Sequence, residues 1–191
     1  MQGGVTTDKI FDSVRELRKD VIIPMVFMTY ANVVFHYGIE EFCARAAEAG
    51  MDGLILPDVP FEEKEEFAGA CRSHGMDLIS MIAPTSEERI DMIASQAEGF
   101  VYCVSSLGVT GTRSSITTDL DSIVARIRKA TDTPVAIGFG ISNPEQAAAM
   151  AAKSDGAIVG SAIVKIVAAE GEAAAPAVGE FARKMVAAVR A

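Results

Sequence analysis

The chain has 191 residues, 50% of them hydrophobic, which is enough for one sizeable core. Its net charge of −9, without a basic run, argues against nucleic acid and anionic membrane surfaces as partners. The 3 cysteines lie far apart in sequence, outside any CxxC or Cys/His cluster, so no metal site is expected and their odd number fits a reducing compartment. Residues 1–8 lack the apolar core of a signal peptide, and no window reaches transmembrane length, so we expect a cytoplasmic protein.

Short apolar runs alternate with amphipathic helical patterns along the whole chain. A first helix, capped by Thr6 or Thr7, carries one apolar face made of Ile10, Phe11, Val14 and Leu17. Strands are expected at 21–28, 53–57, 78–82, 100–104, 135–138 and 157–159. Further helices are expected at 38–49, 61–74, from a cap at Ser86, and at 120–130, 144–153, 161–168 and 176–190, with a long loop at 105–118.

This order of elements predicts an α/β fold with a parallel sheet, because strands that are apolar on both faces alternate with helices. We expect one domain over 1–191, built as six βα units of a (β/α)8 barrel, with two units missing at the front. An open doubly wound sheet is the alternative. A dinucleotide-binding fold of that kind would place GxGxxG after its first strand, where this chain has Met28, Thr29 and Tyr30.

Two glycine turns near the end of the chain are the most informative feature of the sequence. The first is the run IGFGIS at 137–142, and the second is the run GAIVGSA at 156–162. In each, a short apolar strand ends in glycine and leads into a helix, whose first N–H groups and positive dipole end favour an anion. The pair predicts a phosphate clamp after the last two strands, although tight strand-to-helix turns alone would also use glycine.

Five longer stretches resemble the alpha subunit of tryptophan synthase. They are PMVFMTYAN at 24–32, LPDVP at 56–60, SSLGVTG at 105–111, GFGIS at 138–142 and GSAIV at 160–164. That family folds as a (β/α)8 barrel and is a lyase of tryptophan biosynthesis. It cleaves indole-3-glycerol phosphate to indole and glyceraldehyde 3-phosphate, and it passes the indole to a beta subunit that carries pyridoxal phosphate. The resemblance therefore implies an α2β2 assembly, with no cofactor in this chain.

The resemblance also assigns roles to particular positions. The residues expected to hold the phosphate are Gly111, Phe139, Gly140, Gly160 and Ser161. The residues expected to line the indole pocket are Met28, Tyr30, Ile55, Ile82 and Tyr102. Asp58 and the loop 58–61 are expected to face the beta subunit, and Thr110 is expected to act within a lid at 105–118.

The residues themselves allow plainer interpretations of some of these positions. Tyr30 and Tyr102 stand at the carboxyl ends of strands, where barrel sites are built, but they also suit core packing. Asp58 follows a strand and equally suits a helix cap.

The reaction needs a proton for the indole ring and a base for the glycerol hydroxyl. In the family a Glu at the end of the second strand and an Asp in the next loop supply them, and neither motif occurs here. We expect these acids to lie before Met1 in a longer protein, and the 191-residue chain alone to lack lyase activity. We also expect it to be poorly soluble or oligomeric, because its terminal strands would have open apolar edges.

Two other functions stay open at this point. A chain that truly starts at Met1 would be a non-catalytic module that binds phosphate or docks on the beta subunit. A different sugar-phosphate barrel enzyme, such as an isomerase, would need a catalytic Lys, Asp or Glu at a strand end, and Asp58 is the only candidate.

Overall fold

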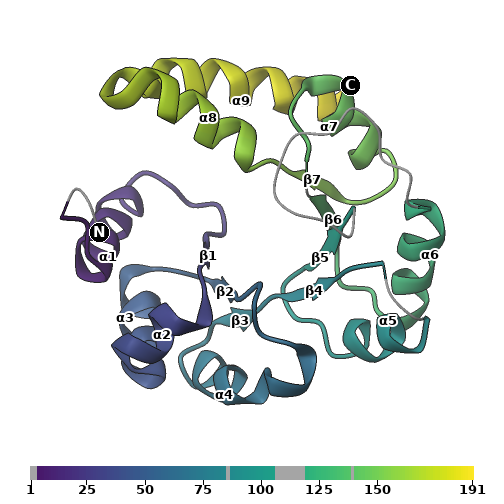
Figure 1. Cartoon of the computed structure of the whole chain (residues 1–191), viewed down its shortest axis with the longest axis horizontal. Coiled ribbons are helices and arrows are strands. Elements are labelled where there is room, and N and C mark those ends of the chain that lie inside the picture. Colours follow the sequence, from purple (N-terminus) through teal and green to yellow (C-terminus); the bar gives the residue numbers. More distant parts are fainter. Residues whose placement is uncertain (1–3, 85–86, 106–118, 139) are drawn as a thin grey trace. The chain divides into compact units, whose positions relative to one another are not determined.

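The computed structural model describes residues 4–84, 87–105, 119–138 and 140–191 (Figure 1). Its contacts divide the chain into two compact units, Met1–Ile79 and Ser80–Ala191. All strand pairs in both units are parallel, as the alternation of strands and helices predicted. The expectation of one domain over 1–191 stays a prediction.

The first unit is a small parallel sheet with its helices. Its elements are α1 (Thr7–Leu17), β1 (Val26–Met28), α2 (Ala31–Tyr37), α3 (Ile39–Ala49), β2 (Gly53–Ile55), the 3₁₀ turn η1 (Phe61–Glu63), α4 (Glu65–Ser73) and β3 (Asp77–Leu78). The strand order is β1-β2-β3, and Met28 at the end of β1 pairs with Ile55 at the end of β2. Thr6 caps α1 as predicted, since its side chain accepts a hydrogen bond from the Lys9 N–H.

An aromatic cluster anchors the first helix to this unit. The Phe11 ring lies 5.8 Å from Phe27, 5.6 Å from Tyr37 and 5.4 Å from Phe42, in tilted or edge-on geometry. Phe11 and Val14 are buried, so the predicted inward face of α1 is confirmed at its centre, but Ile10 and Leu17, which were expected on that face, are 40% and 53% exposed.

The second unit carries the four-stranded sheet β4-β5-β6-β7. Its elements are β4 (Ser80–Ile82), α5 (Glu87–Ala94), β5 (Val101–Val104), α6 (Leu120–Ala130), β6 (Val135–Gly138), α7 (Pro144–Ala151), β7 (Gly156–Ile158), α8 (Ser161–Glu170), the 3₁₀ turn η2 (Gly171–Ala173) and α9 (Ala174–Arg190). Figure 1 shows α8 and α9 lying side by side in the green and yellow part of the chain. The expected cap at Ser86 lies outside the described residues.

The first expected strand is shorter than 21–28, and a helix that the sequence did not suggest follows it. Only Val26–Met28 is a strand, since Pro24 has no N–H for a ladder. The guanidinium of Arg18 instead donates to the carbonyls of Val21 and Ile23, at 3.3 and 2.7 Å. Helix α2 then fills most of the interval 29–37, for which the sequence suggested no element.

The single strand expected at 78–82 is two strands in the structure. Asp77–Leu78 pairs with β2, whereas Ser80–Ile82 pairs with β5. Between them, the N–H of Ile79 still donates to the Leu54 carbonyl at 2.9 Å, and the side chain of Ile79 is buried. The described part of the chain therefore has seven strands and not six, because the two halves of this apolar run pair with different strands.

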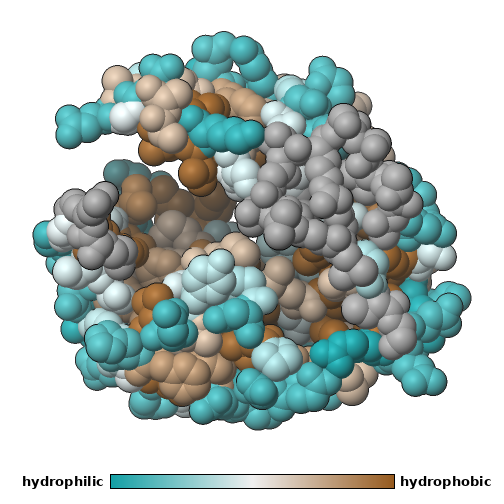
Figure 2. Space-filling model, viewed as in Figure 1, coloured by the Kyte–Doolittle hydropathy of each residue, from teal (hydrophilic) through white to brown (hydrophobic). Residues whose placement is uncertain are grey.

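Several large apolar side chains are exposed, and Figure 2 shows hydrophobic residues among hydrophilic ones on one face. Ile22 and Ile23 lie just before β1, and Val164 lies on α8 just after β7. In the described residues β1 and β7 each occupy the end of a sheet. The expectation of open apolar edges, with the poor solubility that it implies, stays a prediction.

Candidate functional site

The two glycine turns lie next to each other in the second unit. Strands β6 and β7 are parallel neighbours, and Gly138 pairs with Ile158 at their carboxyl ends. Gly140 and Gly160 each come two positions after that pair. Gly140 has φ of 82°, a conformation that side chains rarely adopt, so the turn itself requires glycine there. The pairing thus brings both predicted turns to one edge of the sheet.

The start of α7 is occupied by its own side chains. Asn143 caps this helix, and its side-chain oxygen accepts from the Gln146 N–H at 2.8 Å. In return, the Gln146 side chain accepts from the Ser142 N–H at 2.8 Å and from its hydroxyl at 3.1 Å. This reciprocal cap was not recognised from the sequence, although the spacing of Asn143 and Gln146 is a capping-box signal.

The start of α8 is open by comparison. Its cap residue is Gly160, and among the described residues no side chain caps the helix. A Cβ built on Gly160 meets no heavy atom within 4 Å, so there is space beside the backbone. The helix runs for 10 residues from Ser161, so its first N–H groups, its dipole and the Ser161 hydroxyl together suit an anion.

Tyr102 packs against the end of β6. A Cβ built on Gly138 would lie 2.5–2.7 Å from the Tyr102 ring and hydroxyl, which places the phenol directly over this glycine. Tyr102 is buried, and burial raises the pKa of its hydroxyl. Sequence reasoning missed the role of Gly138, because the reason for glycine is a neighbour 36 positions earlier in the chain.

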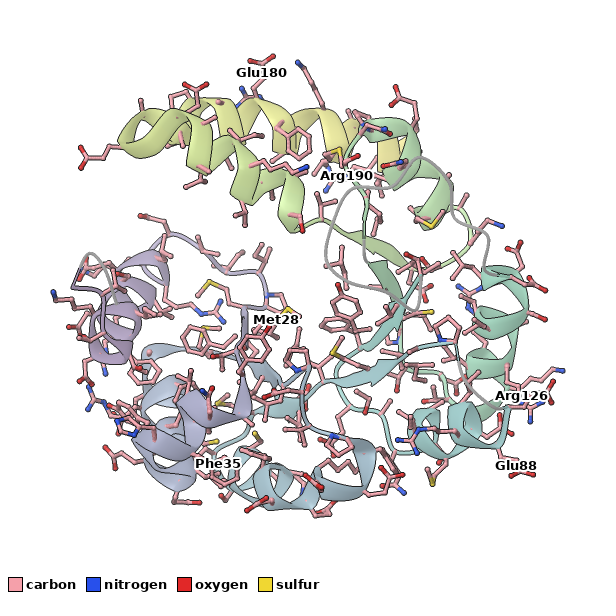
Figure 3. The ribbon with its side chains drawn as sticks, in the orientation of Figure 1. Met28, Phe35, Glu88, Arg126, Glu180 and Arg190 are labelled. Atoms are coloured by element: carbon pink, nitrogen blue, oxygen red, sulfur yellow. The ribbon has the colours of Figure 1, made fainter. Side chains whose placement is uncertain are left out.

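The first unit gathers the other group of expected site residues. Met28 ends β1 and is 55% exposed, and its strand partner Ile55 is buried (Figure 3). Tyr30 stands at the start of α2 and is 63% exposed. Met28 and Tyr30 therefore offer free apolar surface at the carboxyl end of a strand, where ligands bind in parallel βα folds.

Asp58 holds the start of α2. Its two carboxylate oxygens lie 3.0 and 3.2 Å from the Ala31 N–H, which donates to them. The carboxylate thus satisfies a first-turn donor and lies at the positive end of the helix. The plainer interpretation, a cap on the helix that follows the strand, is therefore wrong about the helix, because Asp58 bonds at the start of α2 instead, 27 positions earlier.

The remaining expected positions are either buried or outside the described residues. Ile82, at the end of β4, is fully buried and pairs with Cys103. Gly111, Phe139 and Thr110, with the lid 106–118, lie outside the described residues. The structure groups Met28, Tyr30 and Ile55 in the first unit, and Ile82 and Tyr102 in the second, so a pocket common to all five stays a prediction.

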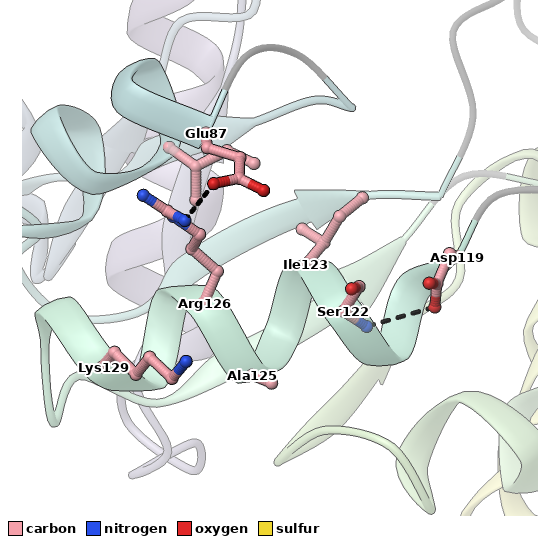
Figure 4. A pocket seen from close by; sticks show the side chains of 8 residues that line it. Glu87, Asp119, Ser122, Ile123, Ala125, Arg126 and Lys129 are labelled. Carbon is pink, nitrogen blue, oxygen red and sulfur yellow. Dashed lines mark hydrogen bonds and ion pairs between the residues drawn. The ribbon is translucent and has the colours of Figure 1, made fainter.

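A separate cavity of about 480 Å³ lies between α5 and α6 (Figure 4). The Arg126 guanidinium reaches across it to Glu87 and also binds Asp91, at 2.8 Å from Nε and 2.5 Å from Nη2. These bonds lower the pKa of Asp91 and raise that of Arg126. The ion pairs of Arg126 with these two carboxylates link α5 to α6. Because the carboxylates already neutralise the guanidinium, the cavity is a poor phosphate-binding site.

Metal and membrane features can be checked only for the described ranges. Within 4–84, 87–105, 119–138 and 140–191, no group of three or more His, Cys, Asp or Glu is placed to hold a metal ion. In the same residues no helix is both long and apolar enough to cross a membrane.

The family model described as tryptophan synthase alpha chain matches residues 1–190. The alpha chain of Lacticaseibacillus casei is 45% identical over 187 residues, which cover 98% of this chain and 70% of the relative. That of Lactiplantibacillus plantarum is 48% identical over 95% of this chain and 69% of the relative. Across the curated relatives compared, this chain spans 62–70% of their length.

Solved structures give the same result. The tryptophan synthase a2b2 complex of Pyrococcus furiosus contains a chain with a TM-score of 0.87 and 31% identity, covering 97% of this chain and 76% of that one. The synthase of Mycobacterium tuberculosis gives a TM-score of 0.85 and 33% identity, covering 100% and 71%. Together with the parallel βα units, these likenesses confirm the predicted fold class, a partial (β/α)8 barrel.

The contact between Tyr102 and Gly138 can be tested by adding one methyl group. We expect Gly138→Ala to force the Tyr102 ring aside and to cost about 1–3 kcal/mol of unfolding free energy, as overpacked cores do. Gly156→Ala is the matched control, because its Cβ would only touch the Ala136 Cβ at 3.8 Å. Urea unfolding followed by tyrosine fluorescence measures both variants, and equal midpoints would contradict the close packing.

Proposed function

The chain belongs to the tryptophan synthase alpha chain family, and on this basis we propose that it serves as the alpha subunit, a lyase of tryptophan biosynthesis. The substrate is indole-3-glycerol phosphate. Its cleavage breaks the bond between the indole ring and the glycerol chain, turns a glycerol hydroxyl into the aldehyde of glyceraldehyde 3-phosphate, and returns a proton to the ring.

The observation that carries this proposal is the open start of α8 beside the Gly140 turn. Ser161 and the first N–H groups of α8 bind the substrate phosphate, and Gly140 lets the neighbouring turn approach it. Gly111 and Phe139 complete the phosphate site by resemblance to the family. The self-capped start of α7 leaves α8 as the anion-binding helix of the pair.

The indole ring is held by apolar and aromatic side chains. Met28 and Tyr30 offer exposed surface at the end of β1, with Ile55 beneath them. Tyr102 is the second residue of β5, before the expected carboxyl end, but its side chain reaches Gly138 at the end of β6. Ile82 supports the neighbouring strand. Thr110 belongs to a lid that closes on the bound substrate, as long βα loops do.

The partner is a beta subunit that carries pyridoxal phosphate, within an α2β2 assembly. The structure of the Pyrococcus furiosus relative is described as an a2b2 complex whose subunits activate one another. Asp58 contributes to docking by fixing the start of α2 through the Ala31 N–H. The chain itself needs no cofactor for this chemistry, and its site of action is the cytoplasm.

A second candidate, a non-catalytic module that binds phosphate and docks on the beta subunit, is favoured by the state of Asp58. This carboxylate is the acid expected at a strand end, and it is already bonded to the Ala31 N–H. Sustained indole release from indole-3-glycerol phosphate by the purified 191-residue chain would exclude the non-catalytic module. We expect none from this chain alone, because the two acids of the family are absent, and release at any sustained rate would contradict this expectation.

Replacing Ser161 by Asp separates phosphate binding from folding. The added carboxylate suits the positive start of α8 and stabilises the helix by about 0.3–1 kcal/mol, but it repels a phosphate. We expect affinity for inorganic phosphate and for indole-3-glycerol phosphate to fall at least tenfold, or about 1.4 kcal/mol, by calorimetry. Ser161→Asn, in which the new side chain has the size of Asp but no charge, should keep most of the affinity for phosphate. Unchanged phosphate binding by the Asp variant would refute the site.

Asp58 offers a test of docking that distinguishes charge from capping. We expect Asp58→Ala to lose about 0.5–2 kcal/mol of stability and to weaken association with a beta subunit, because α2 loses its cap. Asp58→Asn keeps an oxygen acceptor and should behave like the parent in both measurements. If the Asn variant docks as poorly as the Ala variant, the carboxylate meets the partner directly and the positioning role is wrong.

A further inference from the structure

Two of the three cysteines, distant in sequence, meet in the core of the first unit. Cys43 lies on α3 and Cys71 on α4, and their sulfur atoms are 3.8 Å apart. Both side chains are fully buried. Cys103 lies on β5 in the second unit and is also buried. The sequence interpretation, which saw only scattered cysteines, did not anticipate this pair.

The surroundings of the pair are apolar. Phe42, Leu54, Phe67 and Met76 belong to the same buried cluster. Within the described parts of the chain, no third His, Asp, Glu or Cys joins the pair in a group placed to bind a metal. The two thiols therefore have each other as hydrogen-bonding neighbours in a dry environment.

The hydrogen bond has a chemical consequence. Cys71 lowers the pKa of the Cys43 thiol, against the opposing effects of burial and of the Glu40 charge. By contrast, burial alone raises the pKa of Cys103 to about 11. Since the thiolate is the form that oxidants attack, these directions favour oxidation at Cys43 over Cys103.

We propose that Cys43 and Cys71 form a reversible intramolecular disulfide when the protein meets hydrogen peroxide. The Cys43 thiolate attacks one peroxide oxygen, the O–O bond breaks, and Cys43 becomes a sulfenic acid as water is released. The Cys71 sulfur then attacks the Cys43 sulfur, and a second water leaves. Two thiols lose two electrons and two hydrogens, and one peroxide becomes two waters.

Burial of the two thiols limits the size of the oxidant that can reach them. A disulfide holds its sulfurs about 2 Å apart, so the two side chains must rotate toward each other within the packed helices. Peroxide is small enough to reach a buried thiol through brief openings of the core. Glutathione disulfide is far larger and should react much more slowly with the folded protein.

The cross-link would constrain the part of the first unit that carries candidate site residues. The segment it closes runs from α3 to α4 and contains β2 with Ile55, and then Asp58. A link between residues 28 positions apart removes freedom from the unfolded chain, so oxidation is expected to raise Tm by roughly 5–10 °C. The site residues on this segment would thus be held more firmly in oxidising conditions.

The decisive experiment maps the bond in the wild-type chain. Reduced protein is treated with hydrogen peroxide under native conditions, free thiols are alkylated in denaturant, and the protein is digested with trypsin. We expect peptides 20–45 and 65–72 to be joined, with the loss of two hydrogens, and separated again by dithiothreitol. Tm should rise with oxidation and return on reduction.

Two variants sharpen the result. Cys103→Ala should keep the link and the Tm shift, whereas Cys43→Ala should lose both. Recovery of both Cys43 and Cys71 as alkylated thiols from oxidised wild-type protein would overturn the proposal, and so would a bond that joins two copies of the chain. The mapping depends on neither phosphate binding nor lyase activity, so its failure would leave the proposed function untouched.

Discussion

The parallel pairing of β6 with β7 is the constraint on which the candidate site depends. Parallel strands end at the same edge of a sheet, and the pairing of Gly138 with Ile158 aligns those ends. Gly140 and Gly160 therefore face the same region, although 20 positions separate them in sequence. A slip in this register would separate the turns and remove the candidate phosphate site, whatever the local sequence of each turn.

The two helices that follow β6 and β7 differ in how their first turns are capped. The N–H groups at the start of α7 bond to side chains of the same segment, through Asn143 and Gln146, which makes the turn rigid. The start of α8 has glycine in the capping position and no side-chain cap among the described residues. The two similar strand-glycine-helix sequences thus differ at their first helical turns, and the proposed phosphate site uses the start of α8.

In the first unit, one carboxylate and one aromatic cluster place the surface on which docking and indole binding are proposed. Asp58 fixes the start of α2, and Tyr30 and Met28 flank that point. Beneath them, Phe11 joins α1 to the core through three aromatic neighbours. The pair of cysteines lies in the same core, so a change in its redox state acts on the scaffold and leaves the binding groups themselves intact.

The sequence by itself determined the βα rhythm and the fold class, because periodicity, glycine turns and capping residues are local signals, and five short stretches carried the resemblance to the family. The bounds of α6 and β6 follow directly from it. Only the tertiary structure divided the run 78–82 into two strands and brought Cys43 next to Cys71. It also placed the Tyr102 ring over Gly138 and the Asp58 carboxylate at the start of α2. Each of these depends on a partner at least twenty positions away, and folding brings such partners together through hydrogen bonds and packing that no local pattern records.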